Sequence, residues 1–215
     1  MVRIAPSILS GNFLNLEPDI GMVNKNADLI HIDVMDGSFV PNISFGFPVV
    51  EAIAKAVTVP MDVHLMIVNP DKYVGRFAKT GAEMISFHLE AADQAGKDPR
   101  DIIAQIKSFG VKAGLVINPD IPVERLFPYI DDVDFFLIMS VFAGFGGQKF
   151  TPIVRDNLRQ LRASGYTGLT EVDGGVSLSN LPLLHECGLD AAVMGTALFK
   201  SANPAEDIAK IHQMR

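Results

Sequence analysis

The chain has 215 residues, of which 48% are hydrophobic, and a net charge of −7 at pH 7. This length allows one large hydrophobic core, and an acidic chain without a basic run argues against nucleic acid as a partner. No apolar run reaches the roughly 20 residues of a membrane span, and MVRIAPSILS shows no export signal. We therefore expect a cytoplasmic protein with no membrane partner, and the single Cys187 agrees with a reducing compartment.

Strand-like and helix-like segments alternate along the whole chain. The apolar runs that predict strands cover residues 3–9, 28–34, 61–66, 84–89, 113–117, 135–140, 168–172 and 191–194. The segments that predict helices cover residues 17–26, 48–56, 71–79, 99–109, 122–129, 152–163, 179–186 and 204–213. Proline in the first turn supports several of these helices, at Pro18, Pro70, Pro99, Pro122, Pro152 and Pro204. Glycine follows four of them, at Gly81, Gly110, Gly165 and Gly188.

Eight strands joined by crossover helices predict an α/β fold with a parallel sheet. At this length a closed barrel is the economical arrangement, and we expect a single-domain (β/α)8 TIM barrel, one catalytic domain over residues 1–215. An open doubly wound sheet is the alternative. That fold normally has a glycine-rich turn after the first strand, and SILSGNF at residues 7–13 is not one. In such barrels the catalytic residues lie at the C-terminal ends of the strands.

Two histidines and two aspartates lie at or near the C-terminal ends of the predicted strands. His31 and Asp33 are two residues apart in LIHIDVMDG and therefore point to the same face. His64 lies in MDVHLMI, and Asp173 lies in LTEVDGG. A single His-x-Asp pair is more often part of a core, but four such side chains at one rim predict a metal site or an acid–base site. This donor set suits one divalent ion, Zn²⁺, Fe²⁺, Mn²⁺ or Co²⁺, whereas Mg²⁺ prefers more oxygen ligands.

Glycine-rich loops follow the last three predicted strands. Their residues include Gly144, Phe145, Gly146 and Gly147 after strand six, Gly174 and Gly175 after strand seven, and Gly195 and Thr196 after strand eight. Each glycine alone can simply form a tight turn, but three such loops side by side predict a cradle of backbone N–H groups for a phosphate. Met35, Met66 and Met139 fall at the same rim, where they either fill the core or line a dry cavity.

A cation beside two carboxylates and a phosphate cradle suits removal of a proton next to a carbonyl group, with the cation stabilising an enediolate as a Lewis acid. Two bases on opposite faces would invert a stereocentre. The remaining polar residues have weaker claims: we expect His88, Asp62 and Glu171 to pack or to support the site and Asp36 to shape a loop. His185 and His212 are expected at the surface.

The segments IAPSILS, HIDVMDGSFVPN, DVHLMI, KAGLVINP, LIMSV, GFGGQKF, EVDGGV and MGTALF occur in this order from Ile4 to Phe199. Together they resemble the ribulose-phosphate 3-epimerase family. The resemblance implies a ribulose-phosphate-binding type of barrel and interconversion of D-ribulose 5-phosphate and D-xylulose 5-phosphate through a 2,3-enediolate, in the pentose phosphate pathway. It also implies a homo-oligomer, a dimer or a hexamer.

The resemblance also implies residue roles. The metal ligands would be His31, Asp33, His64 and Asp173, and the acid–base pair would be Asp33 and Asp173. The ketose phosphate would contact Ser7, His31, Met35, His64, Met66, Met139, Gly144, Phe145, Gly146, Gly147, Asp173, Gly174, Gly175, Gly195 and Thr196.

The chain departs from the family pattern at two places. Phe142 and Ala143 stand where the family usually has Asn-Pro, and Thr196 stands where serine is common. The first departure keeps a second substrate open, a hexulose phosphate such as D-allulose 6-phosphate. A decarboxylase or aldolase is disfavoured, because strand three has Asp-Val-His instead of Asp-x-Lys-x-x-Asp and no lysine ends a predicted strand. A barrel that only binds a ligand is the non-enzymatic alternative.

Overall fold

A computed structural model describes residues 2–213. The strands are β1 (Arg3–Pro6), β2 (Ile30–Met35), β3 (Met61–Met66), β4 (Met84–His88), β5 (Lys112–Ile117), β6 (Phe135–Met139), β7 (Leu169–Asp173) and β8 (Ala191–Met194). All neighbouring pairs are parallel, in the order β1-β8-β7-β6-β5-β4-β3-β2. A parallel bridge between Ser7 and His31 brings the two ends of the sheet together, so the strands form a nearly closed barrel.

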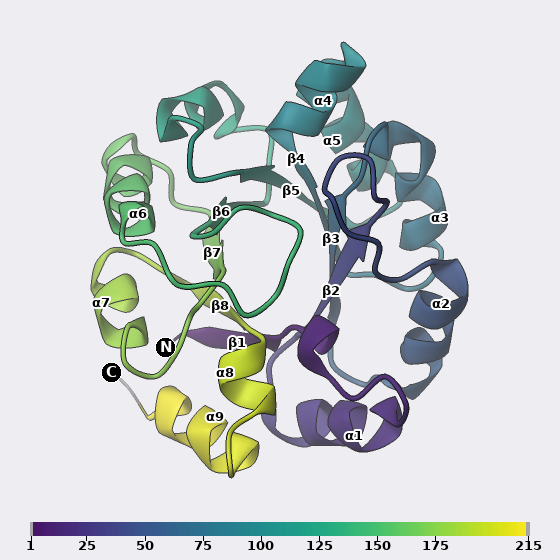
Figure 1. The fold of residues 1–215 in the computed structure, drawn as a ribbon. Coiled ribbons are helices and arrows are strands. Elements are labelled where there is room, and N and C mark those ends of the chain that lie inside the picture. Colours follow the sequence, from purple (N-terminus) through teal and green to yellow (C-terminus); the bar gives the residue numbers. More distant parts are fainter. Residues whose placement is uncertain (1, 214–215) are drawn as a thin grey trace.

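Helices surround the strands (Figure 1). The α-helices are α1 (Leu16–Asn26), α2 (Phe47–Ala56), α3 (Val74–Ala78), α4 (Leu89–Ala95), α5 (Pro99–Ser108), α6 (Ile153–Ala163), α7 (Leu181–Glu186), α8 (Thr196–Phe199) and α9 (Pro204–His212). The 3₁₀ helices are η1 (Ile8–Ser10), η2 (Pro70–Lys72) and η3 (Val123–Tyr129). The predicted α/β class, a (β/α)8 TIM barrel, is confirmed. The expected domain limits, residues 1 and 215, lie outside the described residues.

Glycines follow four of the helices, as predicted, and an aspartate caps the start of one. Gly81, Gly110, Gly165 and Gly188 all have positive φ angles, as expected for residues that follow a helix. Asp98 caps α5 by accepting a hydrogen bond from the Arg100 N–H at 2.9 Å. Among the described residues, no helix has the length and apolar character needed to span a membrane.

Several predicted elements differ from the structure. The single helix expected at 71–79 is split at Tyr73 into η2 and α3. The segment expected as a helix at 122–129 is the 3₁₀ helix η3, because Pro128 inside it cannot donate a backbone hydrogen bond. The short helices α4 and α8 and the turn η1 were not predicted, since each follows its strand almost directly and none spans more than two turns.

Alternating side chains divide the core into two layers. In β6, Phe136 and Ile138 point outward and pack against the surrounding helices in the large core cluster. Leu137 and Met139 point inward and pack against inward residues of other strands, such as Val193. The inward positions of β2, β3, β4 and β7 instead carry buried polar groups: His31, Asp33, Asp62, His64, Ser86, His88 and Glu171. The barrel interior is therefore apolar on one side and polar on the other.

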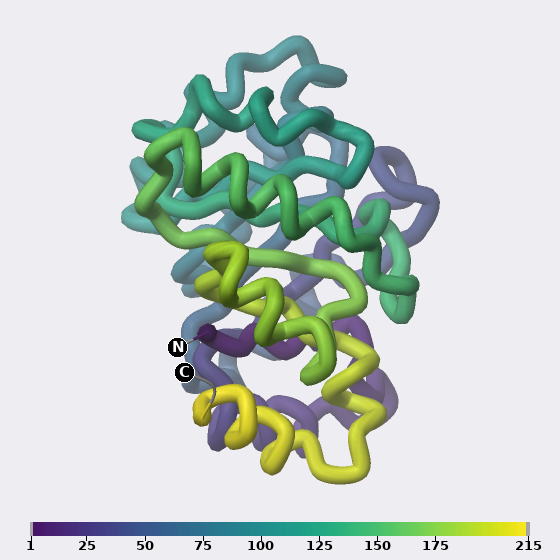
Figure 2. The backbone as a smooth tube through the Cα atoms, turned by 90° about the vertical axis from the view of Figure 1, so that its left-hand side faces the viewer, coloured from purple at the N-terminus to yellow at the C-terminus, as the bar shows by residue number. Residues whose placement is uncertain are grey.

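The loops that follow β2 and β6 lie at the same end of the barrel. Figure 1 looks onto this end, and Figure 2 shows the same loops at one edge of the molecule, beside the outer layer formed by α6, α7 and α9. The Asn42 side-chain N–H₂ of the first loop donates to the Gly144 carbonyl of the second at 2.8 Å. The two loops thus form one joined wall above the C-terminal ends of the strands.

Candidate active site

His31, Asp33, His64 and Asp173 converge above the polar side of the barrel. Each offers a nitrogen or oxygen atom, and these atoms all lie within 4.8 Å of one another. The register explains the arrangement, because Asp33 of β2 pairs directly with His64 of β3. The Asp33 Oδ1 atom lies 3.3 Å from His31 Nε2 and 3.3 Å from His64 Nδ1. The four residues therefore form one compact group of potential ligands.

The partners of His31 leave one of its nitrogens available. Its Nδ1 lies 2.5 Å from Asp62 Oδ2, and this carboxylate holds the hydrogen on Nδ1. Its Nε2 is buried, makes no hydrogen bond in the described chain and faces Asp33. An unpaired buried nitrogen is costly in a core, but a cation would satisfy it. The residues present thus fit a divalent metal ion.

His64 is held by a second buried histidine. Its Nε2 lies 2.9 Å from His88 Nε2, which leaves Nδ1 directed at Asp33. On the far side of His88, the Nδ1 atom lies 3.6 Å from Glu90 Oε1. The contact with His88 lowers the pKa of Glu90 despite the opposing effect of burial, so Glu90 is a carboxylate at neutral pH.

Burial and charge push the pKa values of the two histidines apart. Burial lowers the pKa of His64 to about 4, and the neighbouring Asp33 carboxylate offsets only part of this effect. Burial acts in the same direction on His31, but the carboxylates of Asp62 and Asp33 raise its pKa well above the ordinary value. At pH 7 His64 is therefore neutral, and His31 is an imidazolium when no metal competes for it.

The pKa values of the two aspartates also differ in opposite directions from the ordinary value. Burial, reinforced by the charge of Asp33, raises the pKa of Asp173 to about 7. Burial opposes ionisation of Asp33, but the imidazoles of His31 and His64 hold the pKa of Asp33 well below its usual range. A carboxylate that stays charged and a carboxyl group that exchanges its proton near neutral pH are the elements of an acid–base pair.

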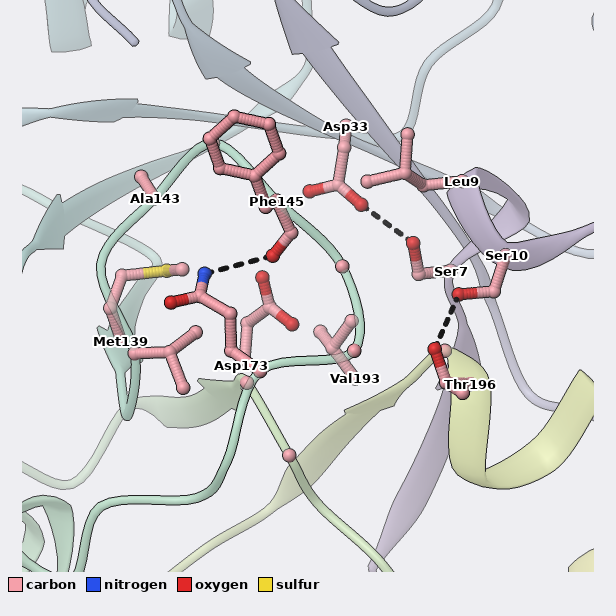
Figure 3. A pocket seen from close by; sticks show the side chains of 18 of the residues that line it. Ser7, Leu9, Ser10, Asp33, Met139, Ala143, Phe145, Asp173, Val193 and Thr196 are labelled. Atoms are coloured by element: carbon pink, nitrogen blue, oxygen red, sulfur yellow. Dashed lines mark hydrogen bonds between the residues drawn. The ribbon is translucent and has the colours of Figure 1, made fainter. Parts of the chain in front are cut away.

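A cavity of about 370 Å³ opens directly above this group. In Figure 3, Asp33 and Asp173 reach into it from different sides, and Ser7 Oγ donates to Asp33 Oδ2 at 2.6 Å. The other residues expected at the substrate that line the cavity are Met35, Met66, Met139, Gly144, Phe145, Gly146, Gly147, Gly174, Gly175, Gly195 and Thr196. His31 and His64, also expected to contact the substrate, are fully buried and do not line it.

The glycine loops meet at one side of the cavity. Gly174 and Gly175 have φ angles of 110° and 60°, which a residue with a side chain rarely adopts. A Cβ atom at Gly175 would lie 2.6 Å from the Phe150 backbone nitrogen, so the loops after β6 and β7 approach each other closely. Ser10 and Thr196 face each other across the same region, with their hydroxyl oxygens 3.4 Å apart (Figure 3).

The loop after β6 is held by side chains that were not predicted as site residues. Gln148 Nε2 donates to the carbonyl groups of Phe142 and Phe145, at 2.7 and 2.9 Å. Asn118 Oδ1 accepts from the Ala143 N–H at 2.9 Å, a bond that a proline at this position would not make. These bonds order the loop despite the absence of the family's proline. Phe142 and Phe145 remain exposed at the mouth of the cavity.

Other polar residues occupy the places expected for them. Asp36 shapes its loop by accepting from the N–H groups of Ser38 and Phe39. Asp62 and Glu171 are fully buried below the cavity. His185 and His212, expected at the surface, are both partly exposed, and the His212 Nε2 atom lies 2.9 Å from Asp28. Reasoning from the sequence also missed Ser44, whose hydroxyl donates to the Asp33 carbonyl at 2.5 Å.

Two histidines and two aspartates that converge at the C-terminal end of a (β/α)8 barrel, below a cavity, are the arrangement of a barrel enzyme. Residues 3–199 match the model of the Ribulose-phosphate 3 epimerase family. Relatives named ribulose-phosphate 3-epimerase include one from Bacillus subtilis, 44% identical over 98% of both chains. Another, from Synechocystis, is 44% identical over 100% of this chain and 94% of the relative. The chain belongs to the ribulose-phosphate 3 epimerase family, as the sequence motifs predicted.

Solved structures with low sequence identity share the fold alone. KGPDC from Streptococcus mutans superposes with a TM-score of 0.73 at 12% identity and covers 100% of this chain and 99% of its own. A mutant tryptophan synthase alpha-subunit from Pyrococcus furiosus gives a TM-score of 0.70 at 16% identity, over 99% and 96% of the two chains. Both comparisons support the barrel architecture.

Proposed function

We propose that the protein is a metal-dependent 3-epimerase that interconverts D-ribulose 5-phosphate and D-xylulose 5-phosphate through a 2,3-enediolate. The observation that carries this proposal is the pair of aspartates at the cavity. Asp33 is held as a carboxylate, whereas the pKa of Asp173 is raised to about 7. β2 and β7, which carry them, are separated in the barrel by β1 and β8. Acids placed on two sides of a sugar can remove a proton from one face and return one to the other.

A divalent ion would be held by His31 through Nε2, His64 through Nδ1, and the carboxylates of Asp33 and Asp173. Nitrogen and carboxylate donors in equal number suit Zn²⁺, Fe²⁺, Mn²⁺ or Co²⁺. When bound, the ion supplies Lewis-acid stabilisation of negative charge on the sugar oxygens. The unpaired Nε2 atom of His31 is the feature of the chain that supports this ligand set.

The chain itself performs the proton transfer. Asp33 is kept in place by the Ser7 hydroxyl at its Oδ2 atom and by the Ser44 hydroxyl at its backbone carbonyl. Either aspartate removes the C3 proton of one epimer, and the other returns a proton from the opposite face. The roles exchange when the reaction runs in the other direction. Met35, Met66 and Met139 give the cavity an apolar lining that limits the access of water to the enediolate.

The phosphate would lie among the glycine loops after β6, β7 and β8. Gly144, Gly147, Gly174 and Gly175 have positive φ angles, which allow backbone N–H groups to be directed at an anion. The Thr196 hydroxyl adds a donor on the same side of the cavity. This arrangement supports a small phosphorylated sugar as the substrate of an acidic protein.

Exchange with solvent tests the proposed reaction directly. With metal-loaded protein in D₂O, we expect deuterium at C3 of the product ketose phosphate, because the proton removed by one aspartate is not the one returned by the other. The measurement is NMR or mass spectrometry of the isolated product. Epimerised product without deuterium would contradict the two-aspartate mechanism.

A hexulose phosphate is the second candidate substrate, supported by the loop after β6. Phe142, Ala143, Phe145 and Gln148 line both the main cavity and a neighbouring cavity of about 380 Å³, so a longer sugar has space nearby. We expect kcat/KM for D-ribulose 5-phosphate to exceed that for D-allulose 6-phosphate by at least about tenfold. The matched comparison is the double variant Phe142→Asn, Ala143→Pro, which restores the Asn-Pro pair that is usual in the family. Preference of the native chain for the six-carbon sugar would change the substrate assignment.

Metal binding is expected to depend on pH. In the metal-free protein Asp173, with a pKa of about 7, holds its proton at pH 6, and His31, whose pKa is raised, also remains protonated. Because a cation must displace these protons, its affinity should rise between pH 6 and pH 8, by up to about tenfold per pH unit for each proton displaced. Titration calorimetry of Zn²⁺ in two buffers measures the released protons, and Asp173→Asn should release fewer. A pH-independent affinity would contradict this prediction.

We further infer that the reaction belongs to the pentose phosphate pathway and that the chain acts in the cytoplasm as a homo-oligomer, without nucleic-acid or membrane partners. Exposed apolar side chains support self-association: Leu14 is 99% exposed, Ile43 76% and Phe13 53%. The Phe13 ring packs against that of Phe45, with centroids 5.3 Å apart, so these residues extend from the buried core to the surface.

A further inference from the structure

The ring of His64 can present either of its two nitrogens to a metal ion, and its surroundings select one of them. A neutral histidine that ligates through one nitrogen carries its hydrogen on the other, and that hydrogen needs an acceptor. For His31 the acceptor is Asp62, at 2.5 Å. For His64 the only neighbour within hydrogen-bond distance of Nε2 in the described chain is the Nε2 atom of His88, at 2.9 Å.

His88 can accept this hydrogen bond only if its own hydrogen is on Nδ1. Nδ1 faces Glu90 Oε1 at 3.6 Å, and the carboxylate charge favours the hydrogen on that side. Packing fixes the ring itself, because Phe39 lies against it with centroids 4.9 Å apart, and the His64 ring stacks on it at 5.0 Å. His88 is fully buried, so water does not replace either partner.

Glu90 is itself anchored by Asn118, the residue that follows β5. Its Oε1 atom accepts two hydrogen bonds from Asn118, from the backbone N–H and from the side-chain N–H₂, both at 2.9 Å. Helix α4 begins directly after His88, and Glu90 lies in its first turn. A negative charge is favoured at this end of a helix because the helix dipole is positive there. The carboxylate is thus fixed on the side opposite His64.

We propose that His88 and Glu90 are positioning residues that hold His64 with its hydrogen on Nε2 and its Nδ1 lone pair directed at the metal site. We call His64, His88 and Glu90 the relay. The inference depends on the proposed metal-dependent function, because the relay would give His64 the orientation and the tautomer that a metal ligand needs. Asn118, which also accepts from the Ala143 N–H, connects the relay to the loop after β6. Neither His88 nor Glu90 lines the main cavity, so both act through His64.

The test compares two substitutions of His88 by their affinity for Co²⁺ alone, measured by competition with a chelator. In His88→Phe the aromatic ring can still pack against Phe39, but His64 Nε2 loses its acceptor. We expect affinity to fall about 10- to 100-fold, the range typical for loss of a residue that orients a metal ligand. In His88→Gln the side-chain oxygen can accept the same hydrogen, so we expect most of the affinity to return.

Two further readouts separate positioning from a general effect on folding. Nitrogen-15 NMR of the ring of His64 is measured on Zn²⁺-loaded protein, because without an ion Asp33 Oδ1, 3.3 Å from Nδ1, competes for the hydrogen. It should show hydrogen on Nε2 in the native protein and in His88→Gln, and a shift of hydrogen to Nδ1 in His88→Phe. The absorption spectrum of bound Co²⁺ should change in His88→Phe alone. If His88→Phe does not fold, Glu90→Gln carries the test, with Glu83→Gln as its control. Glu83 is exposed and lies 2.8 Å from Lys112 at the other end of the barrel.

Each outcome decides the proposal. Weaker binding in His88→Phe with recovery in His88→Gln, or weaker binding in Glu90→Gln than in Glu83→Gln, supports the relay. If His88→Phe binds Co²⁺ within twofold of the native protein and the His64 nitrogens are unchanged, the relay is wrong while the proposed function stands. If the native protein binds no divalent ion, both the relay and the metal-dependent function are wrong.

Discussion

Replacing Asp173 by asparagine is expected to lower kcat roughly 10³-fold while leaving the barrel folded. The amide has nearly the shape of the carboxyl group but cannot exchange a proton near neutral pH, so one face of the sugar loses its acid or base. The backbone role of this position is unaffected, because the bond from the Ser140 N–H to the Asp173 carbonyl, at 2.7 Å, does not involve the side chain. Turnover of metal-loaded protein and circular dichroism measure the two effects separately.

The stability of the same variant has a definite sign. A carboxyl group whose pKa is raised by folding, from near 4 to about 7, destabilises the folded state increasingly as pH rises through that range. Metal-free Asp173→Asn should therefore unfold at the same or a higher temperature than the native chain at pH 8. Asp156→Asn on α6, exposed and remote from the cavity, is the control and should leave turnover unchanged. Full activity of Asp173→Asn would remove Asp173 from the mechanism.

Strand periodicity and the predicted parallel barrel together indicated the centre of the candidate site. His31 and Asp33 alternate with Ile32 in an apolar run, so both had to point to the same face, and parallel strands bring their C-terminal ends together. The strands at 61–66 and 191–194 were predicted with the residues that the structure gives them. The glycine loops were predicted from their residue type, because glycine adopts backbone conformations that other residues avoid, and Gly174 has a φ angle of 110°.

The supporting contacts could not be predicted in the same way. Ser44 reaches the Asp33 carbonyl from a loop eleven residues further on, and Asn118 reaches Glu90 across 28 residues and Ala143 across 25. Loop side chains follow no period, so nothing in the sequence shows which backbone group they meet. Likewise, the strand positions indicated that His88 is buried, but only the coordinates show that its Nε2 atom faces His64.

Removing the divalent ion with a chelator is expected to abolish turnover and to destabilise the fold. Without a cation, two buried carboxyl groups and two buried imidazoles lie within 4.8 Å of one another with no ion to bridge them. An ion present at 100 times its Kd stabilises the folded state by about 2.7 kcal/mol. For a chain of this size, that corresponds to a rise in Tm of roughly 5–10 °C on reloading.

Reloading with different ions separates a specific site from a general effect of divalent charge. Zn²⁺, Fe²⁺, Mn²⁺ or Co²⁺ should restore both turnover and Tm, because two imidazoles bind these ions well, whereas Mg²⁺ should restore little at the same concentration. Replacement of the proposed ligand His64 by alanine should abolish the difference in Tm between stripped and reloaded protein. His185→Ala on α7, away from the cavity, should preserve that difference and serves as the matched control. Stripped protein with undiminished turnover would show that Asp33 and Asp173 act without a cation.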